Sequence, residues 1–245
     1  MTDIHCHILP HTDDGAQSIA DAVEMARAAW ASGVTAIAAT PHFFGDDASV
    51  RLIPTIRRRT AQLRAVLKEA KIPIEIFDGA EVLCTEKTRA PAQNRALPTL
   101  GTGRYVLCEF YFDEDIRRIA KILDTIAQAG YLPVLAHPER YDAFYKDPGV
   151  AGFFFEAGFA LQLNRGSILG RFGDNARHTA RYLLSHGLCH AVASDAHSPR
   201  RRTTHMADVY ESVTEYCGRR VADALFSENP SRILNGKRLL TPNEL

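Results

Sequence analysis

The chain has 245 residues with 29 basic and 29 acidic side chains, so its formal net charge at pH 7 is +0. Hydrophobic residues make up 46% of the sequence and charged residues 24%, which is ordinary for a globular protein and argues against disorder. The balanced charge argues against bulk attraction to nucleic acid or to an anionic membrane. No apolar run of about 18 residues occurs, so we expect no stable insertion into a membrane.

The cysteines indicate a reducing compartment. They lie at positions 6, 84, 108, 189 and 217, so their number is odd; no C-x-x-C pair occurs, and four of them lie in apolar surroundings. We therefore expect reduced, buried thiols and a cytoplasmic protein. An N-terminal signal segment is not expected, because His5 and His7 would interrupt its apolar core.

Short apolar stretches alternate with amphipathic stretches along the chain, which predicts repeated strand–helix units. The expected strands cover residues 2–8, 34–40, 72–82, 105–110, 131–136, 159–164 and 189–194. The expected helices run from an N-cap at Ser18 to Gly33 and over residues 54–70, 115–130, 150–157 and 174–186, with further helices between 205 and 234. In the first helix the expected buried face comprises Ile19, Val23, Met25, Ala26 and Trp30. About seven such units predict a single α/β domain with a closed or nearly closed parallel barrel, and a doubly wound open sheet is the alternative.

The first expected strand carries an unusual set of polar residues, in the segment 3–7 (DIHCH). Side chains alternate between the faces of a strand, so Asp3, His5 and His7 would share one face, and Ile4 and Cys6 the other. Buried imidazoles and carboxylates are costly unless they are satisfied, and a metal ion would satisfy them. The motif taken alone also fits an ordinary pair of histidines at a strand end. Asp3 lies one step deeper, and we expect it to orient a histidine instead of binding the metal.

Other polar residues recur at the C-terminal ends of the expected strands, where they comprise His7, His42, Glu81, Glu109, His137, Asp195 and His197. In a parallel barrel these ends meet on one face, which is where barrel active sites are built. Each residue alone could be an ordinary turn residue, but their shared position predicts one metal site. Histidine and carboxylate without thiolate suit Mn²⁺, Zn²⁺ or Fe²⁺. The candidates are too many for one ion with its roughly four to six ligands, so two or three ions with bridging carboxylates are expected.

Four short segments resemble the four motifs of the polymerase-and-histidinol-phosphatase (PHP) superfamily. They are His5-x-His7, Thr40-Pro41-His42, Ala136-His137-Pro138-Glu139-Arg140 and Ser194-Asp195-x-His197. The opening segment together with Asp13-Asp14-Gly15 is similar, more narrowly, to the bacterial manganese-dependent protein-tyrosine phosphatases of capsule and exopolysaccharide loci. The resemblance covers residues 3 to 240, essentially the whole chain. It implies a distorted, TIM-like (β/α)₇ PHP barrel, with residues 1–245 forming one metallophosphatase domain.

The resemblance also implies three metal ions, in the first place Mn²⁺, with Fe²⁺, Zn²⁺ or Mg²⁺ as alternatives. The ligands of the first ion would be His5, His7, Glu81 and Asp195. Glu81 would bridge to a second ion, which Glu109 and His137 complete. The third ion would be held by Asp14, His42 and His197. Many superfamily members have histidine at the position of Glu109, and the carboxylate is typical of the tyrosine-phosphatase branch. His11 stands where the family often has glycine, and we expect an exposed loop residue there, with an extra ligand as the alternative.

Two arginines match family positions that grip phosphate. Arg140 follows His137-Pro138-Glu139, as in the family. Arg202 precedes Thr203-Thr204-His205-Met206, where the family usually has Arg-Pro-Pro-His-Met, so Arg200 or Arg201 could take its place. A guanidinium group suits a phosphate dianion because it donates two parallel hydrogen bonds.

The implied activity is metal-dependent hydrolysis of a phosphomonoester. Its substrate would be phosphotyrosine in a protein, in the first place the tyrosine-rich tail of a bacterial tyrosine kinase of polysaccharide biosynthesis. A hydroxide held between the ions would attack phosphorus in line, and the metal cluster with Arg140 and Arg202 would neutralise the equatorial oxygens. His42 and His197 complete the expected catalytic set. A tyrosine phenolate, with a pKa of about 10, needs less help from a general acid than an alkoxide does, so metal binding by these histidines would not disable the reaction.

Other chemistries remain as alternatives. The same fold could act on a small phosphate ester such as histidinol phosphate, or it could be a metal-binding regulatory module without turnover. A cysteine nucleophile is not expected, because no cysteine has an arginine six positions later; Cys84 is followed by Arg89, one position too early. A metal-dependent amidohydrolase is disfavoured, because no strand ends in a lysine of the kind that forms a bridging carbamate.

Overall fold

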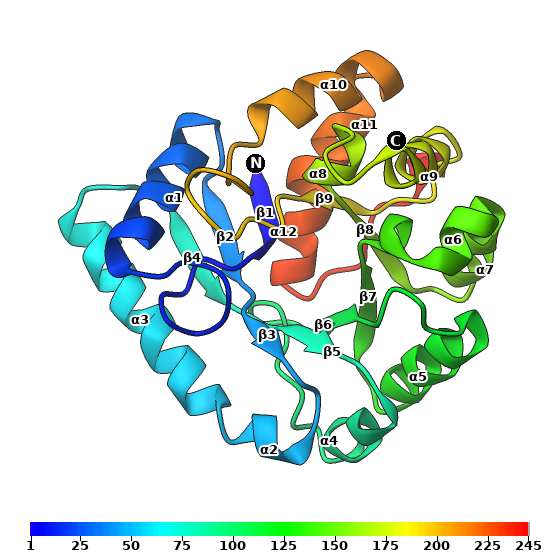
Figure 1. Cartoon of the computed structure of the whole chain (residues 1–245), viewed down its shortest axis with the longest axis horizontal. Helices are drawn as coiled ribbons and strands as arrows, with labels where there is room; N and C mark the ends of the chain where they lie inside the picture. The colour runs from blue at the N-terminus through cyan, green and yellow to red at the C-terminus, as the bar shows by residue number, and fades with distance from the viewer. Residues whose placement is uncertain (245) are drawn as a thin grey trace.

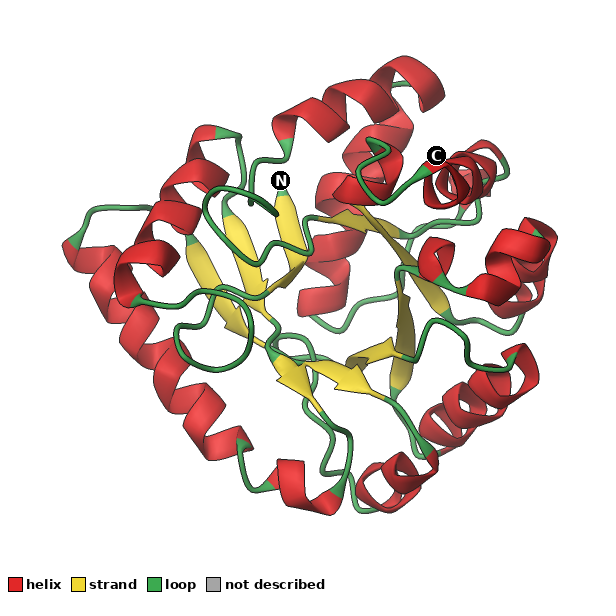
Figure 2. Ribbon diagram, in the orientation of Figure 1, coloured by secondary structure: helices red, strands yellow, loops and turns green. Residues whose placement is uncertain are grey.

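Parallel strands form a central ring with the helices outside it (Figures 1 and 2). The computed structural model describes residues 1–244, and within them nine strands are present. In chain order they are β1 (Thr2–Cys6), β2 (Ala36–Ala39), β3 (His42–Phe43), β4 (Glu75–Asp78), β5 (Glu81–Leu83), β6 (Tyr105–Glu109), β7 (Leu132–Ala136), β8 (Ala160–Asn164) and β9 (Ala191–Ala193).

The strands pair in two parallel sheets, with the orders β1-β2-β4 and β3-β5-β6-β7-β8-β9. The ring closes where β1 meets the end of β9, because the amide of His7 donates to the carbonyl of Ala196 and the amide of Asp195 donates to that of His5, both at 2.9 Å. The predicted α/β barrel is therefore confirmed, and the open doubly wound sheet does not form.

Two of the expected strands each correspond to a pair of strands. The stretch 34–40 forms β2, and β3 follows beyond its expected end, after Pro41, whose missing N–H removes a donor from the ladder. The stretch 72–82 is broken at Gly79, where a Cβ atom would lie 3.0 Å from the Leu100 side chain and 3.2 Å from the carbonyl oxygen of Ala39. Glu81 thus begins β5, and the expectation that it ends a single strand is wrong. If each broken pair is counted as one position, the ring has the seven positions that were expected.

Twelve α-helices lie among the described residues. They are α1 (Ile19–Ala31), α2 (Asp47–Val50), α3 (Ile53–Glu69), α4 (Arg89–Gln93), α5 (Ile116–Gln128), α6 (Asp142–Lys146), α7 (Ala151–Glu156), α8 (Arg165–Ile168), α9 (Asp174–Ser185), α10 (Ala207–Cys217), α11 (Arg219–Asp223) and α12 (Asn229–Leu234). Ser18 caps α1 as predicted, because its side chain accepts from the amide of Asp21. None of the described helices combines the length and the apolar character needed to cross a membrane.

The buried face of α1 differs from the expected one. Ile19 and Trp30 are 41% and 44% exposed, so their assignment to the core is wrong. The helix instead buries Met25 with a stripe of alanines, at positions 22, 26 and 29. Small side chains at this spacing let the helix pack closely on the strands, and the bulky ends of the expected face then lie outside the contact.

The interior of the ring is apolar at the end where the strands begin and polar at the opposite end. Alternate residues of the strands, such as Leu107, Val134 and Ala160, form an inner cluster with Ile233 and Leu234 of α12. Helix α12 therefore closes the end of the barrel at which the strands begin, and Figure 1 places it within the outline of the ring. The polar side chains that come after these residues on the inner faces of the strands lie at the opposite end of the barrel.

Strand β1 does not alternate regularly. Its pairing with β2 is irregular between Asp3 and Cys6. Ile4 packs in the inner cluster, whereas Cys6 packs in the outer core between strands and helices. The expectation that Ile4 and Cys6 share one face is therefore wrong, because the register shifts between Asp3 and Cys6.

Candidate metal centre

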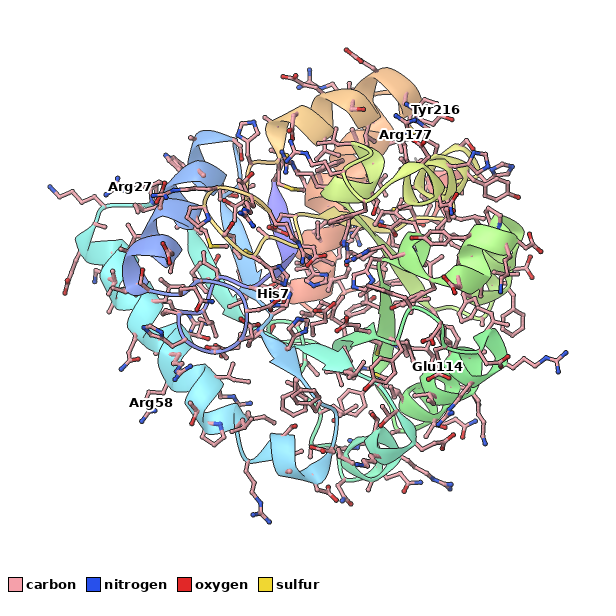
Figure 3. All side chains as sticks on the ribbon, viewed as in Figure 1. His7, Arg27, Arg58, Glu114, Arg177 and Tyr216 are labelled. Atoms are coloured by element: carbon pink, nitrogen blue, oxygen red, sulfur yellow. The ribbon has the colours of Figure 1, made fainter. Side chains whose placement is uncertain are left out.

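All nine predicted metal ligands lie together at one end of the barrel, and Figure 3 places His7 near the centre of the ring. They form four overlapping groups, in each of which the ligand atoms lie within 4.8 Å of one another. The groups are His7, Asp14, His42 and His197; His5, His7 and Glu81; His5, His137 and Asp195; and His42, Glu81 and Glu109.

The alternation of side chains along the strands places these residues in the interior of the barrel. On β6, Tyr105 and Leu107 belong to the inner cluster, so Glu109 follows on the same face two residues later. His137 follows β7 directly and Asp195 follows β9 after one residue, and both adopt left-handed backbone conformations, with φ of 35° and 49°. Such conformations cost roughly 1–3 kcal/mol for residues other than glycine and concentrate at functional sites.

Glu81 lies at the centre of the cluster and contacts four of its histidines. Its Oε1 atom lies 2.9 Å from Nε2 of His137 and 3.1 Å from Nε2 of His5. Its Oε2 atom lies 3.2 Å from both Nε2 of His7 and Nδ1 of His42. Burial alone would raise the pKa of this carboxyl, but the positive charge of His5 and the hydrogen bonds from the histidines hold it well below its usual range.

The donor set fits divalent metal ions. The Nε2 atoms of His5 and His7 face each other at 3.3 Å, in a fully buried position. Two imidazole nitrogens in this arrangement need a proton or a metal ion between them. Burial lowers the pKa of His5, yet the charges of Glu81 and Asp195 outweigh it and raise the value to about 9. The excess of carboxylates therefore calls for positive charge in the site, which divalent cations would supply.

His42 lies on the solvent side of the cluster and contacts two of its carboxylates, Glu81 and Glu109. Its Nδ1 atom lies 3.4 Å from Oε2 of Glu109, in addition to its contact with Glu81. Burial opposes protonation of His42, but hydrogen bonds to Glu109 and Glu81 raise its pKa to about 11. The contact with His42 therefore connects Glu109 to the rest of the cluster.

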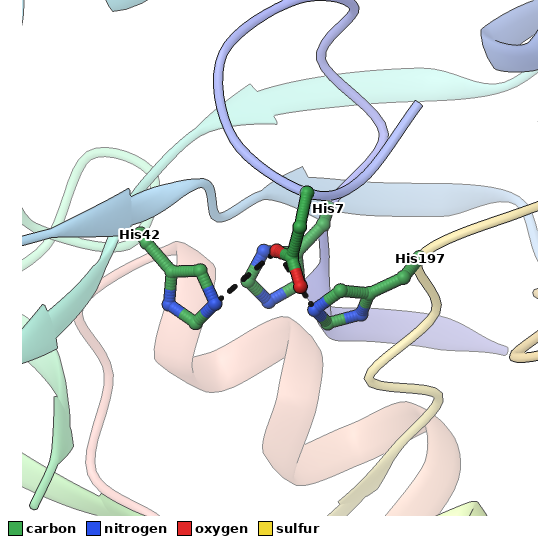
Figure 4. Close-up of side chains that lie close together, drawn as sticks. His7, His42 and His197 are labelled. Carbon is green, nitrogen blue, oxygen red and sulfur yellow. Dashed lines mark ion pairs between the residues drawn. The ribbon is translucent and has the colours of Figure 1, made fainter. Parts of the chain in front are cut away.

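The outermost group is open to solvent. Oδ1 of Asp14 lies 3.4 Å from Nε2 of His42 and 3.5 Å from Nε2 of His197 (Figure 4). The rings of His7 and His197 are 3.8 Å apart between centroids. Burial and the positive charges of His7 and Arg202 lower the pKa of His197 to about 4, so its ring is a neutral potential ligand.

Three residues that the sequence analysis missed support the ligands. Asp13 accepts from His7, with Oδ2 2.7 Å from Nδ1; it belongs to the Asp13-Asp14-Gly15 segment but has no role assigned from the sequence. Gln162 Oε1 lies 2.9 Å from Nδ1 of His5, and its amide nitrogen donates to Asn164. Asn164 in turn donates to Oδ2 of Asp195. The sequence does carry a signal for Gln162 and Asn164, because they alternate with leucines in an otherwise apolar strand.

Asp3 has a different role from the expected one. Its Oδ1 atom accepts from the main-chain amide of Ser194 at 3.0 Å, and its Oδ2 atom accepts from the Ser194 hydroxyl. Its contact with His5 is with the main-chain amide, at 3.3 Å, and not with the ring. The expectation that Asp3 orients a histidine ring is therefore wrong, and the side chain instead ties β1 to the turn that follows β9.

Arg140 and Arg202 both lie at the edge of the cluster. Nη1 of Arg140 lies 3.7 Å from Oδ2 of Asp195, and Nη2 of Arg202 forms an ion pair with the same oxygen. The Arg140 guanidinium lies between the rings of Phe112 and Phe172, 4.4 Å from each centroid. Arg200 and Arg201 are exposed, so Arg202 is the member of this run that faces the site. His11 is exposed, as expected.

The cysteines lie away from this chemistry. Cys6, Cys84, Cys108 and Cys189 are buried and Cys217 is half-buried, and all five are free thiols. Burial raises the pKa of the Cys6 thiol well above its usual range. A protonated thiol in the outer core is a poor nucleophile, which agrees with the absence of a C-x₅-R motif.

Comparison with known proteins places the chain in a defined group. The family model for "Capsular polysaccharide synthesis, CpsB/CapC" matches residues 1–235. The chain is 34% identical over 245 residues to tyrosine-protein phosphatase YwqE of Bacillus subtilis (strain 168), over 100% of this chain and 92% of that protein. It is 30% identical over 243 residues to tyrosine-protein phosphatase CpsB of Streptococcus pneumoniae, over 96% of this chain and 98% of that protein. Among solved structures, one from the work on YwqE of Bacillus subtilis and CpsB of Streptococcus pneumoniae, described as unique metal-dependent tyrosine phosphatases, matches with a TM-score of 0.88 and 33% identity. That match covers 98% of this chain and 97% of the other.

Proposed function

Because the chain belongs to the CpsB/CapC family of capsular polysaccharide synthesis, we propose that it is a metal-dependent phosphatase that hydrolyses phosphotyrosine in proteins. The observation that carries the proposal is the cluster of histidines and carboxylates around Glu81, with Arg140 and Arg202 at its edge. Two relatives that match nearly the whole chain are named tyrosine-protein phosphatases. We take residues 1–245 as one PHP metallophosphatase domain.

We propose three ions, with Mn²⁺ as the first candidate and Fe²⁺, Zn²⁺ or Mg²⁺ as alternatives. The first would be held by His5, His7, Glu81 and Asp195, the second by Glu81, Glu109 and His137, and the third by Asp14, His42 and His197. The close grouping of His5 and His7 with Glu81, and of Asp14 with His42 and His197, supports the first and third of these sites. Glu109 and His137, proposed for the second ion, each lie close to other members of the cluster, Glu109 to His42 and Glu81 and His137 to His5 and Asp195. When bound, the ions would activate water at neutral pH and offset the negative charge of the phosphate.

The protein's own residues would bind and orient the phosphate. Arg140 and Arg202 both contact Asp195 at the edge of the cluster, where their guanidinium groups would meet the oxygens of an incoming dianion. The Arg140 guanidinium lies over the rings of Phe112 and Phe172, and this packing restricts its motion before a ligand binds. His42 and His197 complete the proposed catalytic set at the solvent side, where they would position the phosphate oxygens. A phenolate leaving group needs less help from a general acid than an alkoxide does.

The family also suggests a physiological substrate. We propose the tyrosine-rich tail of a bacterial tyrosine kinase that serves polysaccharide assembly, which agrees with the capsular description of the family. We also propose that the protein works in the cytoplasm. Five free cysteines, four of them buried, support a reducing compartment.

The decisive experiment combines metal analysis with turnover. Wild-type protein and the variants His5→Ala and His178→Ala are purified, and their metal content and Mn²⁺-dependent hydrolysis of a phosphotyrosine peptide are measured. His178 is an exposed histidine of α9 and serves as the matched control. We expect several ions per chain in the wild type and the control, and a loss of metal and at least about 100-fold lower kcat/KM in His5→Ala. Chelator-resistant turnover would overturn the metal-dependent mechanism.

Two further arms separate the alternatives. Histidinol phosphate is tested beside the peptide, and a higher kcat/KM for the small ester would favour that substrate class over protein phosphotyrosine. Bound metal without hydrolysis of any phosphomonoester would point to a regulatory module. Cys6→Ala is expected to retain turnover, because this thiol is buried in the outer core, and a complete loss with metal still bound would revive cysteine chemistry.

A further inference from the structure

An aromatic cavity adjoins the metal centre. It has a volume of about 280 Å³, and its walls include His42 and Glu109, which also belong to the ligand cluster. The other walls that matter are Phe44, Leu83, Tyr111 and Phe112. We call this cavity the aromatic notch. Its volume is close to the lower end of small-molecule sites, roughly 300 Å³, which suits one planar group.

The notch is lined by apolar side chains that the fold leaves exposed. Phe44 is 64% exposed, Tyr111 is 56% exposed and Phe112 is 40% exposed. Phe44 follows β3 directly, and the other two follow β6, so all three lie at the end of the strands where the ligands gather. Exposed aromatic residues that are grouped in this way beside a polar site indicate binding more often than chance.

The backbone around the notch is fixed before any ligand arrives. Gly45 has φ of +57°, and a Cβ atom there would lie 2.7 Å from the carbonyl oxygen of Leu83, so the chain turns sharply just after Phe44. The amide of Phe110 donates to the Tyr141 hydroxyl at 3.2 Å. The amide of Asp142 donates to the carbonyl of Phe112 at 2.8 Å. The aromatic walls are therefore tied to β5 and to the segment after β7.

Phe112 contacts both a ligand residue and Arg140 at the edge of the cluster. Its ring meets the ring of His137 edge-on, with centroids 6.0 Å apart at 74°, and the Arg140 guanidinium lies over its face at 4.4 Å. A phosphate held by Arg140 beside the ligand cluster would thus have an aromatic surface next to its ester oxygen.

We propose that the aromatic notch receives the phenyl ring of the phosphotyrosyl side chain, with Phe44 and Tyr111 as specificity-determining residues. This inference rests on the proposed function. An aryl ring can stack on or meet these rings edge-on, whereas an alkyl ester such as phosphoserine is too short to fill the notch. The notch therefore selects aryl over alkyl phosphomonoesters, and it does so through the ring and not through the phosphate.

The test compares Phe44→Ala and Tyr111→Ala with the control variants Phe153→Ala and Tyr216→Ala. The control residues are 61% and 55% exposed and lie on α7 and α10. With Mn²⁺ present, we expect kcat/KM for phenyl phosphate to fall about tenfold in each notch variant, mainly through KM, and to change less than about twofold for ethyl phosphate. The control variants should behave as the wild type for both esters.

Binding without turnover gives a second readout. The dissociation constants of phenylphosphonate and methylphosphonate are measured by calorimetry on the Mn²⁺-loaded protein. We expect the wild type to prefer phenylphosphonate by about tenfold or more and the notch variants to lose most of this preference, while metal content stays unchanged.

Three outcomes would count against these assignments. Equal losses for the two esters, or an unchanged preference for phenylphosphonate in the notch variants, would overturn the aryl subsite while leaving the phosphatase function intact. A wild type that hydrolyses neither phenyl phosphate nor the phosphotyrosine peptide would overturn the proposed function. The phosphonate measurement still decides in that case whether the notch binds an aryl group.

Discussion

The Nδ1 atom of His7 lies 2.7 Å from the Oδ2 atom of Asp13, and the same oxygen accepts from the main-chain amide of His42 at 2.9 Å. One carboxylate outside the proposed ligand set therefore orients the ring of one ligand and the backbone of another. Burial opposes ionisation of Asp13, but the hydrogen bond from His7 outweighs it and lowers its pKa to about 2. Such a partner fixes the tautomer that leaves Nε2 free for a metal.

Replacement of Asp13 by asparagine should weaken metal binding more than catalysis. An amide can present an N–H group to Nδ1, which would favour the wrong tautomer of His7. We expect the apparent affinity for Mn²⁺ to fall about 10- to 100-fold, with kcat at saturating Mn²⁺ much less affected. Titration of activity and calorimetry with Mn²⁺ measure this effect. Asp174→Asn, at a carboxyl 90% exposed, is the control, and an unchanged affinity in Asp13→Asn would refute the assigned role.

Arg59 should hold the loop that presents Asp13 and Asp14. Its Nη1 atom donates to Oγ1 of Thr12 at 3.0 Å and to the main-chain carbonyl of His11, from helix α3. Arg59→Met keeps the aliphatic stem and removes these donors. We expect several-fold weaker Mn²⁺ binding, because the loop that carries two site carboxylates loses its anchor. Arg58→Met, an exposed neighbour, should leave affinity unchanged, and equal behaviour of the two variants would contradict this role.

Arg140→Lys should impair phosphate binding while metal binding survives. Lysine keeps the charge but loses the planar fork and the stacking on Phe112 and Phe172. We expect kcat/KM for a phosphotyrosine peptide to fall about 100-fold at unchanged Mn²⁺ affinity. Arg181→Lys, on the exposed side of α9, is the matched control. If the lysine variant kept wild-type kcat/KM, a point charge would suffice at this position.

His190 should make folding stability depend on pH. It is buried, its Nδ1 atom accepts from the amide of Leu161 at 3.1 Å, and burial lowers its pKa to about 4. Between pH 6.5 and about 4 the unfolded chain binds a proton here that the folded chain does not, so the contribution is present above pH 6.5 and is lost as pH falls.

The variant His190→Asn isolates this contribution, since asparagine can still accept from the Leu161 amide. Urea unfolding of the metal-free wild type and variant is compared at pH 7.5 and pH 5. We expect the wild type to lose roughly 2 kcal/mol more than the variant on going to pH 5. A parallel pH dependence of the two proteins would rule out a protonation penalty at His190.

The predictable part of the site is the part that a local pattern encodes. The positions of β6, β7 and β8 follow from apolar runs bounded by turn residues, and the side chains at their ends then share a face because strands alternate. That argument located Glu109 and His137 without any knowledge of their neighbours. It could not foresee the register shift in β1 or the break at Gly79, because both depend on how closely another strand or side chain approaches.

The sequence by itself determined the alternation of strands and helices, the seven strand positions of the barrel, and the set of polar residues at the strand ends. Hydrogen-bond pattern and side-chain period are local properties, so they can be read from the order of residues. Only the tertiary structure decided which side chains meet. Asp3 binds Ser194, 191 positions away, His5 meets Gln162 of β8, beyond β9 in the ring, and the aromatic notch joins segments after β3 and β6. These contacts depend on barrel closure and on the backbone conformations at residues such as His137, which packing of the whole chain imposes.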